Sequence, residues 1–181
     1  AINVKIYLMN LRNKENKKVD YDIDFWINPT FGNFEEKTSR HILTEFMGDD
    51  NYLKMRNVYS INFGDVNVFM TSSLPINSAE LNKMLVKSIN TTVSLDPKEE
   101  KTIVFALGCS MSDKENLRLI AKYTDIANAK RELKIIKDEW AKTLVTVKVK
   151  SPDASFDYMV NGWYLYQTLS SRIFAKSGFY Q

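Results

Sequence analysis

The last part of the chain, residues 152–174, has the pattern of a helix with apolar side chains on nearly every face. One set recurs at helical spacing, and its apolar members are Phe156, Met159, Val160, Trp163 and Phe174. A second set makes the remaining surface apolar as well: Tyr158, Leu165, Tyr166, Leu169 and Ile173. A helix that faces water carries one apolar stripe, so a helix of this kind has to be buried by neighbouring segments. We therefore expect the chain to be a fragment of a larger protein that covers this helix.

The flanks of this helix carry start and stop signals. Ser151 is suited to cap the helix, and Pro152 is suited to its first turn. Asp153 and Asp157 lie near the positive end of the helix dipole, which accounts for both carboxylates without a catalytic role. Ser177-Gly178 then ends the helix.

Alternating apolar residues predict β-strands in the first part of the chain. Residues 2–9 and 19–27 both alternate, and the polar segment 10–18 between them predicts a hairpin. Further strand candidates, separated by turn-forming residues, lie at about 38–47, 52–58, 66–73, 85–93 and 101–108. Seven short strands at this spacing favour an antiparallel β-sandwich.

Helical spacing replaces the alternation after Gly108. Ser112 and Glu115 have the spacing of a capping box, which predicts the start of a helix. Its expected apolar face consists of Leu117, Ile120 and Ala121. A second helix is expected over residues 125–143, with the apolar stripe Ala129, Leu133, Ile136 and Trp140. Residues 144–150 alternate and are predicted to be extended, so that they lead from this helical connector into the terminal helix.

Charge and hydropathy exclude some classes of protein. The chain has 25 Lys and Arg against 22 Asp and Glu, and this net charge of +3 is spread along the sequence rather than gathered into a basic stripe. We therefore expect no nucleic-acid partner. No apolar run approaches the roughly 18 residues of a membrane span.

Few residues suggest chemistry of their own. Asp22 and Asp24 share a strand face about 7 Å apart, the order of separation of a glycosidase carboxylate pair, but such pairs usually belong to a solvated face. His41 is the only histidine, and we expect it to be a structural residue of the sheet. Cys109 is the only cysteine, which predicts an unreactive thiol at a strand end and suits a reducing cytoplasm. The sequence therefore predicts no metal site and no complete catalytic set.

The terminal helix also carries a family resemblance. Residues 151–167 read Ser-Pro-Asp-x-x-x-Asp-x-x-x-Asn-x-Trp-x-x-Tyr-Gln, and Ser171-Arg172-Ile173 and Ser177-Gly178-Phe179-Tyr180-Gln181 follow. This run resembles the entrance to the catalytic barrel of glycoside hydrolase family 94, which holds cellobiose-type phosphorylases and the phosphorylase region of cyclic β-1,2-glucan synthetase. The Tyr-Gln and Ser-Gly-Phe-Tyr-Gln pieces most resemble the β-1,2-glucan branch. A Gly-Phe-Arg-Asp motif that follows in the family is absent from this chain.

The resemblance implies an α+β fold in three parts. Residues 1–110 would be a segment of an antiparallel β-sandwich, 111–150 a helical linker, and 151–181 the first helix of an (α/α) barrel that is otherwise absent. The parent would be a glycoside phosphorylase or glycosyltransferase that breaks or makes β-glucans, with inorganic phosphate as co-substrate and no cofactor. The general-acid Asp of the family lies beyond Gln181, so the chain alone is expected to be inactive. The parent could be held at the inner membrane by regions outside this chain, which itself would lie in the cytoplasm.

The resemblance also names candidate residues at the edge of the sugar site: Arg172, Lys176, Tyr180 and Gln181. A packing or surface role is the alternative for each of them. Lys176 replaces an Arg that is common in the family, which argues against bidentate recognition there. Trp163, Tyr166 and Gln167 are expected to pack within the barrel.

A different class of function remains open. The first part of the chain could be a carbohydrate-binding or protein-interaction sandwich with no enzymatic role, in which an exposed Trp26 stacks on sugars. The apolar terminal helix also predicts self-association, with a homodimer as one form. Titration with β-1,2- and β-1,4-glucooligosaccharides separates a binding module from a scaffold.

Overall fold

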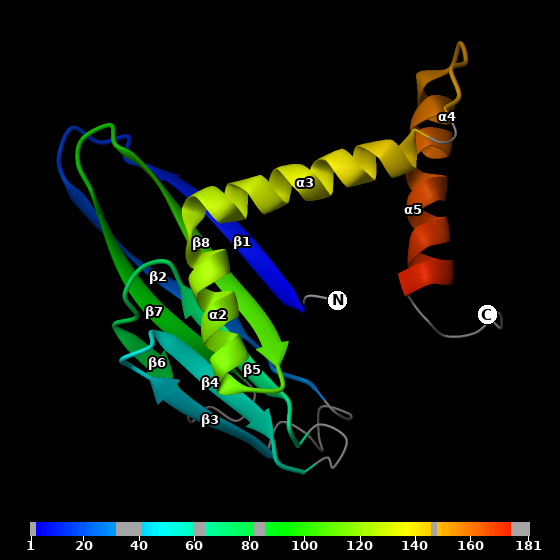
Figure 1. Ribbon diagram of the computed structural model, residues 1–181. Coiled ribbons are helices and arrows are strands. Elements are labelled where there is room, and N and C mark those ends of the chain that lie inside the picture. The colour runs from blue at the N-terminus through cyan, green and yellow to red at the C-terminus, as the bar shows by residue number, and fades with distance from the viewer. Residues whose placement is uncertain (1–2, 32–40, 60–63, 82–85, 146–147, 175–181) are drawn as a thin grey trace. The chain divides into compact units, whose positions relative to one another are not determined.

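The computed structural model describes residues 3–31, 41–59, 64–81, 86–145 and 148–174, with only the backbone described for residues 172–174 (Figure 1). The chain divides into two compact units, Ala1–Lys130 and Arg131–Gln181. The first unit holds the sheets and the helix that follows them, the second holds the terminal helix, and the helix Ile126–Leu144 begins in the first unit and continues into the second. No helix in the described ranges is both long enough and apolar enough to cross a membrane.

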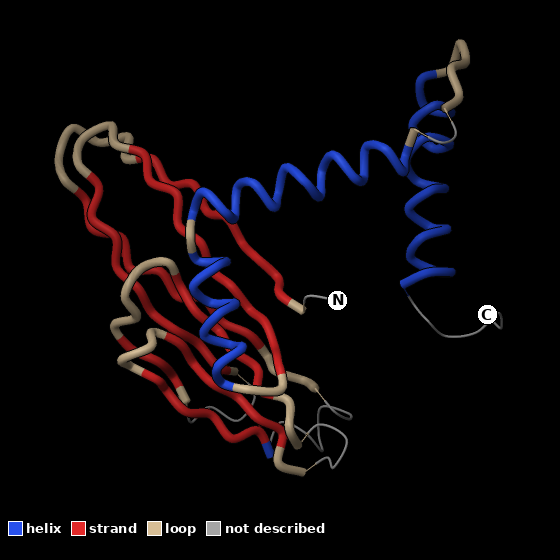
Figure 2. Tube along the Cα trace, viewed as in Figure 1, coloured by secondary structure: helices blue, strands red, loops and turns tan. Residues whose placement is uncertain are grey.

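Antiparallel strands in the described part of the first unit form two sheets (Figure 2). The larger sheet has the order β1-β8-β5-β4-β3, and the smaller sheet has the order β2-β7-β6. The strands are β1 (Val4–Arg12), β2 (Val19–Ile27), β3 (Ile42–Met47), β4 (Tyr52–Asn57), β5 (Asn67–Ser72), β6 (Ser78–Glu80), β7 (Lys87–Leu95) and β8 (Glu100–Ser110). The predicted antiparallel, sandwich-like α+β fold is therefore confirmed at this level.

The predicted hairpin between the first two strands is wrong. β1 pairs with β8 in the larger sheet, whereas β2 pairs with β7 in the smaller one. Each of the connections β1–β2 and β7–β8 therefore crosses from one sheet to the other, and Asn13 ties the two crossings together. Its side-chain amide, which is fully buried, donates to the carbonyl oxygens of Leu95 and Asp96, both at 3.0 Å. Alternation alone predicts strands but does not say which strands pair.

Apolar side chains of both sheets meet in one core. Phe25 of β2 stacks on Phe105 of β8 with ring centroids 4.9 Å apart, and Tyr7 of β1 meets Phe25 edge-on at 5.1 Å. The buried members of this core are Ile42, Leu53, Met55, Met70, Ile76, Ile89, Val93, Leu95, Ile103 and Phe105. The core face of β1 carries Tyr7 and Leu11, while Val4 and Ile6 pack on the opposite side of the sheet.

Helix α2 (Asp113–Thr124) covers that opposite side of the larger sheet. Leu119, Ile120 and Tyr123 are buried in a second cluster with Tyr52, Phe69 and Ala106 of the sheet. The predicted apolar face is therefore displaced, since Leu117 is only half-buried and Ala121 is exposed. An ion pair from Lys54 of β4 to Asp113 joins the first turn of the helix to the sheet.

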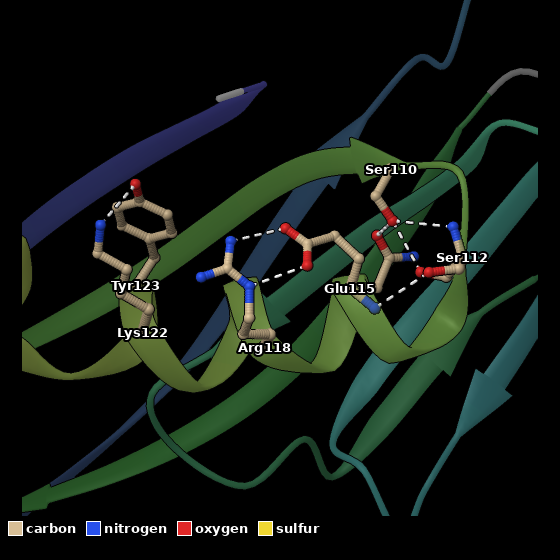
Figure 3. Close-up of polar contacts among 7 residues, drawn as sticks. Ser110, Ser112, Glu115, Arg118, Lys122 and Tyr123 are labelled. Carbon is tan, nitrogen blue, oxygen red and sulfur yellow. Dashed lines mark hydrogen bonds and ion pairs between the residues drawn. The ribbon is translucent and has the colours of Figure 1, made fainter. Parts of the chain in front are cut away.

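The start of α2 follows the predicted capping box only in part (Figure 3). The hydroxyl of Ser112 accepts the Glu115 amide at 3.3 Å, as expected for an N-cap. The Glu115 carboxylate instead makes a two-pronged contact with Arg118, at 2.8 and 2.7 Å. The Ser112 amide donates to the Ser110 hydroxyl at 3.2 Å, so Ser110 takes the place of the carboxylate in the box.

Helix α3 (Ile126–Leu144) agrees closely with the predicted range, and its first amides are capped by Asp125, which accepts from Asn128 N at 2.7 Å. Its predicted stripe is mostly exposed, because only Ala129 is buried. The terminal helix consists of consecutive α and π segments: α4 (Ala154–Tyr158), η3 (Met159–Trp163), α5 (Tyr164–Thr168) and η4 (Leu169–Phe174).

Candidate functional site

Most of the residues that were predicted to lie at the edge of a sugar site are outside the described residues. This is the case for Lys176, Tyr180 and Gln181. The backbone of Arg172 belongs to η4, but its side chain is outside the description. Substrate contact by these four residues therefore stays a prediction.

One face of the terminal helix is polar and fully engaged within the second unit. Asp153, Asp157 and Asn161 are spaced four apart, which places them on one side of a helix. Asp153 Oδ1 accepts from Ser155 N at 2.8 Å and caps the helix, so Asp153 takes the capping role predicted for Ser151. Asp157 Oδ1 accepts the amide of Ser151 at 2.8 Å.

Asn161 continues this polar face one turn further on. Its side-chain amide donates to Val149 O at 2.7 Å, and its oxygen accepts Val149 N at 2.8 Å. One side chain thus satisfies both backbone groups of Val149, as a neighbouring strand would. Asp153, Asp157 and Asn161 therefore hold the incoming segment against the helix. The two carboxylates thus have two structural roles near the start of the helix: they bind backbone amides, and they lie near the positive end of the helix dipole.

The apolar faces of the same helix are largely exposed. No residue of α4, η3 or α5 is buried. The exposed fraction is 81% for Tyr158, 56% for Trp163 and 59% for Tyr166. Trp163 and Tyr166 have only each other as an aromatic neighbour in the described chain, with ring centroids 5.7 Å apart. The predicted all-round apolar helix is thus present, and the described residues do not cover it.

An apolar cavity of about 330 Å³ lies between α3 and the terminal helix, within the second unit. Its lining consists of Trp140, Leu144, Gly162, Tyr166, Leu169 and Ser170. None of its described lining residues is Lys or Arg, so this part of the lining offers no positive charge to a phosphate. We interpret the cavity as a packing defect of an uncovered helix pair rather than as a substrate pocket.

Other candidate residues have structural surroundings. Asp22 and Asp24 lie on an exposed strand face, where they accept hydrogen bonds from Thr92 Oγ1 at 2.7 Å and Asn90 Nδ2 at 3.0 Å. His41 is exposed just before β3 and stacks on Tyr59, with centroids 4.7 Å apart, so it is not an internal residue of the sheet. Cys109 is half-buried in β8, and burial raises the pKa of its thiol, which suits the predicted lack of reactivity.

Shifted pKa values among the described residues do not gather into a catalytic set. Burial lowers the pKa of Lys87, although nearby Glu80 opposes the shift. Burial, together with the charge of Asp113, raises the pKa of Tyr52. No group of three or more His, Cys, Asp or Glu in the described ranges could hold a metal ion.

Sequence reasoning missed the buried Lys87, whose ammonium group donates to the carbonyl of Leu81. It sits at an inward position of β7, where alternation predicts an apolar residue, so no sequence signal pointed to it. The outward residues of the same strand lie beside a row of aspartates and Trp26 on β2. The alternation of residues 20–26 in the sequence predicts that row.

Comparison with known proteins relates the whole chain to one enzyme and half of it to two others. No protein-family model matches. Cyclic beta-(1,2)-glucan synthase NdvB of Rhizobium meliloti (strain 1021) is 24% identical over 208 residues, which takes in 98% of this chain and 7% of that protein. N,N'-diacetylchitobiose phosphorylase of Vibrio proteolyticus is 32% identical over 89 residues, 49% of this chain and 11% of the relative. The enzyme of the same name from Vibrio furnissii is 30% identical over 82 residues, 45% of this chain and 10% of the relative.

The chain therefore spans from 7% to 11% of the length of these relatives. The sequence identities are low, and the three relatives agree with the resemblance to glycoside hydrolase family 94. The protein is related in sequence to a region of a cyclic glucan synthase and of chitobiose phosphorylases.

Proposed function

We propose that this chain is a non-catalytic segment of an enzyme that phosphorolyses or synthesises β-glycosidic bonds, with a β-1,2-glucan as the leading substrate. It would supply part of the sandwich, the linker helices and the first helix of the catalytic barrel. The observation that carries this proposal is the terminal helix, whose polar face is engaged by residues 149–155 while its apolar faces are exposed. The similarity to the glucan synthase along 98% of the chain supports the same assignment.

The terminal helix would act as a positioning element in the parent. Asp157 and Asn161 fix the incoming segment, so the helix enters the barrel in one orientation. Burying exposed aromatic side chains such as Trp163 and Tyr166 against further barrel helices would stabilise the assembly by about 1.5–3 kcal/mol each. Arg172, Lys176, Tyr180 and Gln181 would then stand at the edge of the sugar site.

The chemistry that we propose for the parent is inverting phosphorolysis or its reverse. Phosphate attacks the anomeric carbon while a carboxylic acid protonates the leaving oxygen, so one acid and one anion pocket suffice. Among the described residues two carboxyl groups have shifted pKa values, and both shifts are unsuited to a proton donor. A hydrogen bond from the Asp96 amide lowers the pKa of Glu99, and Arg118 lowers the pKa of Glu115.

A direct assay tests the proposal. The 181-residue chain is incubated with inorganic phosphate and, in separate reactions, β-1,2-, β-1,4-glucooligosaccharides and N,N'-diacetylchitobiose. We expect no sugar 1-phosphate above the protein-free control. Release of glucose 1-phosphate, or of its acetamido analogue, would overturn the assignment of a non-catalytic segment.

Self-association provides a second test, since exposed apolar surface favours it. Light scattering over a concentration series should show oligomers, and Tyr158→Lys or Tyr166→Lys should shift the chain toward the monomer. Lys122→Glu, on α2 in the other unit, is the control and should leave the distribution unchanged. A strict monomer at every concentration would argue against an uncovered helix.

A further inference from the structure

The outward face of the β2-β7-β6 sheet carries an ordered set of polar side chains beside an exposed tryptophan. Cross-strand register places Asp24 opposite Asn90 and Asn90 opposite Ser78. In the next row on this face, Trp26 lies opposite Ser88, which lies opposite Glu80. The alternate residues of β2 and β7 pack inward on the core, so these rows point away from it. β2, β7 and β6 can be followed in Figure 1.

The carboxylates of this face are oriented by neutral partners. Asn90 Nδ2 donates to Asp24 Oδ1 at 3.0 Å, and Thr92 Oγ1 donates to Asp22 Oδ1 at 2.7 Å. Asn77 Nδ2 in turn donates to Thr92 Oγ1 at 2.7 Å, which extends the network to the segment before β6. A carboxylate can accept about four hydrogen bonds, so each aspartate keeps acceptor sites for a ligand hydroxyl.

A shallow groove of about 690 Å³ runs across these rows. The lining residues that bear on recognition are Asp24, Trp26, Ser78, Glu80, Ser88 and Asn90. Trp26 lines the groove and is 64% exposed. A groove with one aromatic platform and several fixed polar groups has the composition of a ligand site.

The chemistry of the face selects an uncharged, hydroxylated ligand. Asp22, Asp24 and Glu80 would repel phosphates and other anions. Asp22 and Asp24 already accept from Thr92 and Asn90, and no group of three or more His, Cys, Asp or Glu in the described ranges could hold a metal ion. A sugar ring has an apolar C–H side for the indole and hydroxyl groups that donate to carboxylates, and hydrogen bonds to ionised acceptors are among the stronger ones.

A protective role for the edge strand explains only part of this pattern. β2 is at the edge of its sheet, and charged residues on an edge strand limit aggregation. That role accounts for the aspartates at positions 20, 22 and 24. It gives no role to the exposed indole of Trp26 on the same face, because protection of an edge needs charge and not an aromatic side chain.

We propose that this face is a glycan-binding surface, with Trp26 stacked on one sugar ring and Asp24, Asn90 and Ser88 bound to its hydroxyl groups. The ligand class is a neutral oligosaccharide, such as a β-glucan. The proposal goes beyond the phosphorylase assignment, because it needs no barrel and holds for the sandwich alone.

Isothermal titration of the 181-residue chain with three probes tests the surface: β-1,2-glucooligosaccharides, β-1,4-glucooligosaccharides and chitooligosaccharides, each at millimolar concentration. We expect heat of binding with at least one series. Trp26→Ala should raise the dissociation constant about tenfold or more, since loss of an aromatic contact and its buried area is worth about 1.4 kcal/mol or more. Asp24→Asn should raise it severalfold.

Matched controls separate this site from general effects. Trp163→Ala removes an indole of similar exposure, 56% against 64%, from the other unit. Asp20→Asn removes an outward carboxylate of β2 that is not among the described lining residues of the groove. Both should bind as the unchanged chain does, and far-UV circular dichroism should show that all four variants fold.

Two results would overturn the proposal: no heat with any probe, and binding that Trp26→Ala leaves unchanged. If no probe gives heat, a further measurement is whether Trp26→Ala abolishes a monomer–dimer equilibrium. Its abolition would identify the face as a protein contact. None of them bears on the sugar 1-phosphate assay, so failure of this proposal and failure of the phosphorylase assignment are distinguishable.

Discussion

Replacement of Asn13 by alanine should destabilise the first unit more than any exposed polar substitution. The Asn13 amide nitrogen lies 2.8 Å from Lys17 O and 3.0 Å from Leu95 O and Asp96 O, and its oxygen accepts the Glu15 amide at 2.9 Å. The side chain is fully buried, so alanine removes its bonds to these backbone groups where water has little access, although Asp96 O keeps the Glu99 amide at 3.0 Å. At about 0.5–1.5 kcal/mol for each lost bond, and more for a carbonyl left buried, we expect a loss of about 2–4 kcal/mol. That is a large part of a typical stability of 5–15 kcal/mol.

Native-state hydrogen exchange of the β8 amides is the suitable assay, because it reports the opening of this unit without a contribution from the second one. Asn10→Ala is the matched control, since Asn10 is exposed and only accepts from Thr102 Oγ1 at 2.8 Å. It should cost less than about 0.5 kcal/mol. Asn13→Asp should resemble Asn13→Ala, because a carboxylate accepts the Glu15 amide but donates to no carbonyl. If the free energy of opening of Asn13→Ala lies within 0.5 kcal/mol of that of the unchanged chain, the Asn13 side chain does not hold the β1–β2 and β7–β8 connections together.

Two further predictions concern packing and pH. Gly108→Ala would place a Cβ 2.5 Å from the ring of the buried Phe69, so urea unfolding should show a loss of about 1–3 kcal/mol. Gly162→Ala, where a Cβ meets nothing within 4 Å, should instead stabilise the chain by up to about 1 kcal/mol, and equal effects at both glycines would contradict the packing argument. Burial lowers the pKa of the Lys87 ammonium group in the folded chain. Between that lowered pKa and 10.5 the unfolded chain binds more protons than the folded chain does. The free energy of unfolding should therefore rise with pH over this range. Lys87→Met should remove this rise from the urea midpoints, and a rise that persists would assign it to another group.

Much of the local structure was predictable, because it depends on short-range periodicity. The helix expected over residues 125–143 is found at Ile126–Leu144, and the strand expected over 19–27 is found with those limits. The strand Ser78–Glu80 was missed because three residues are too few to show alternation. The exposed apolar helix was predictable for a different reason, since its composition alone exceeds what one buried stripe requires.

Features that depend on distant partners were not predictable in the same way. The hairpin prediction failed because residues 2–9 and 19–27 alternate equally well whether or not they pair with each other. Asp153 rather than Ser151 is the cap, because the Ser151 hydroxyl bonds the backbone N and O of Asp153, at 3.1 and 2.9 Å, and not an amide of the first helical turn. This arrangement depends on how the incoming segment folds back. The sugar-edge residues came from a motif alone, whereas the groove beside Trp26 emerges only when the register of three strands is known.

The central position of β8 in the larger sheet has a consequence for synthesis of the protein. β8 lies between β1 and β5, so Arg12 finds its partner Glu100, and Val4 finds Gly108, only after most of the sandwich has been translated. Such distant pairings are slow to form, because chain entropy is lost before the contacts compensate for it. On the ribosome, β1 and β5 therefore remain open edges that chaperones can bind until Ser110 has left the exit tunnel.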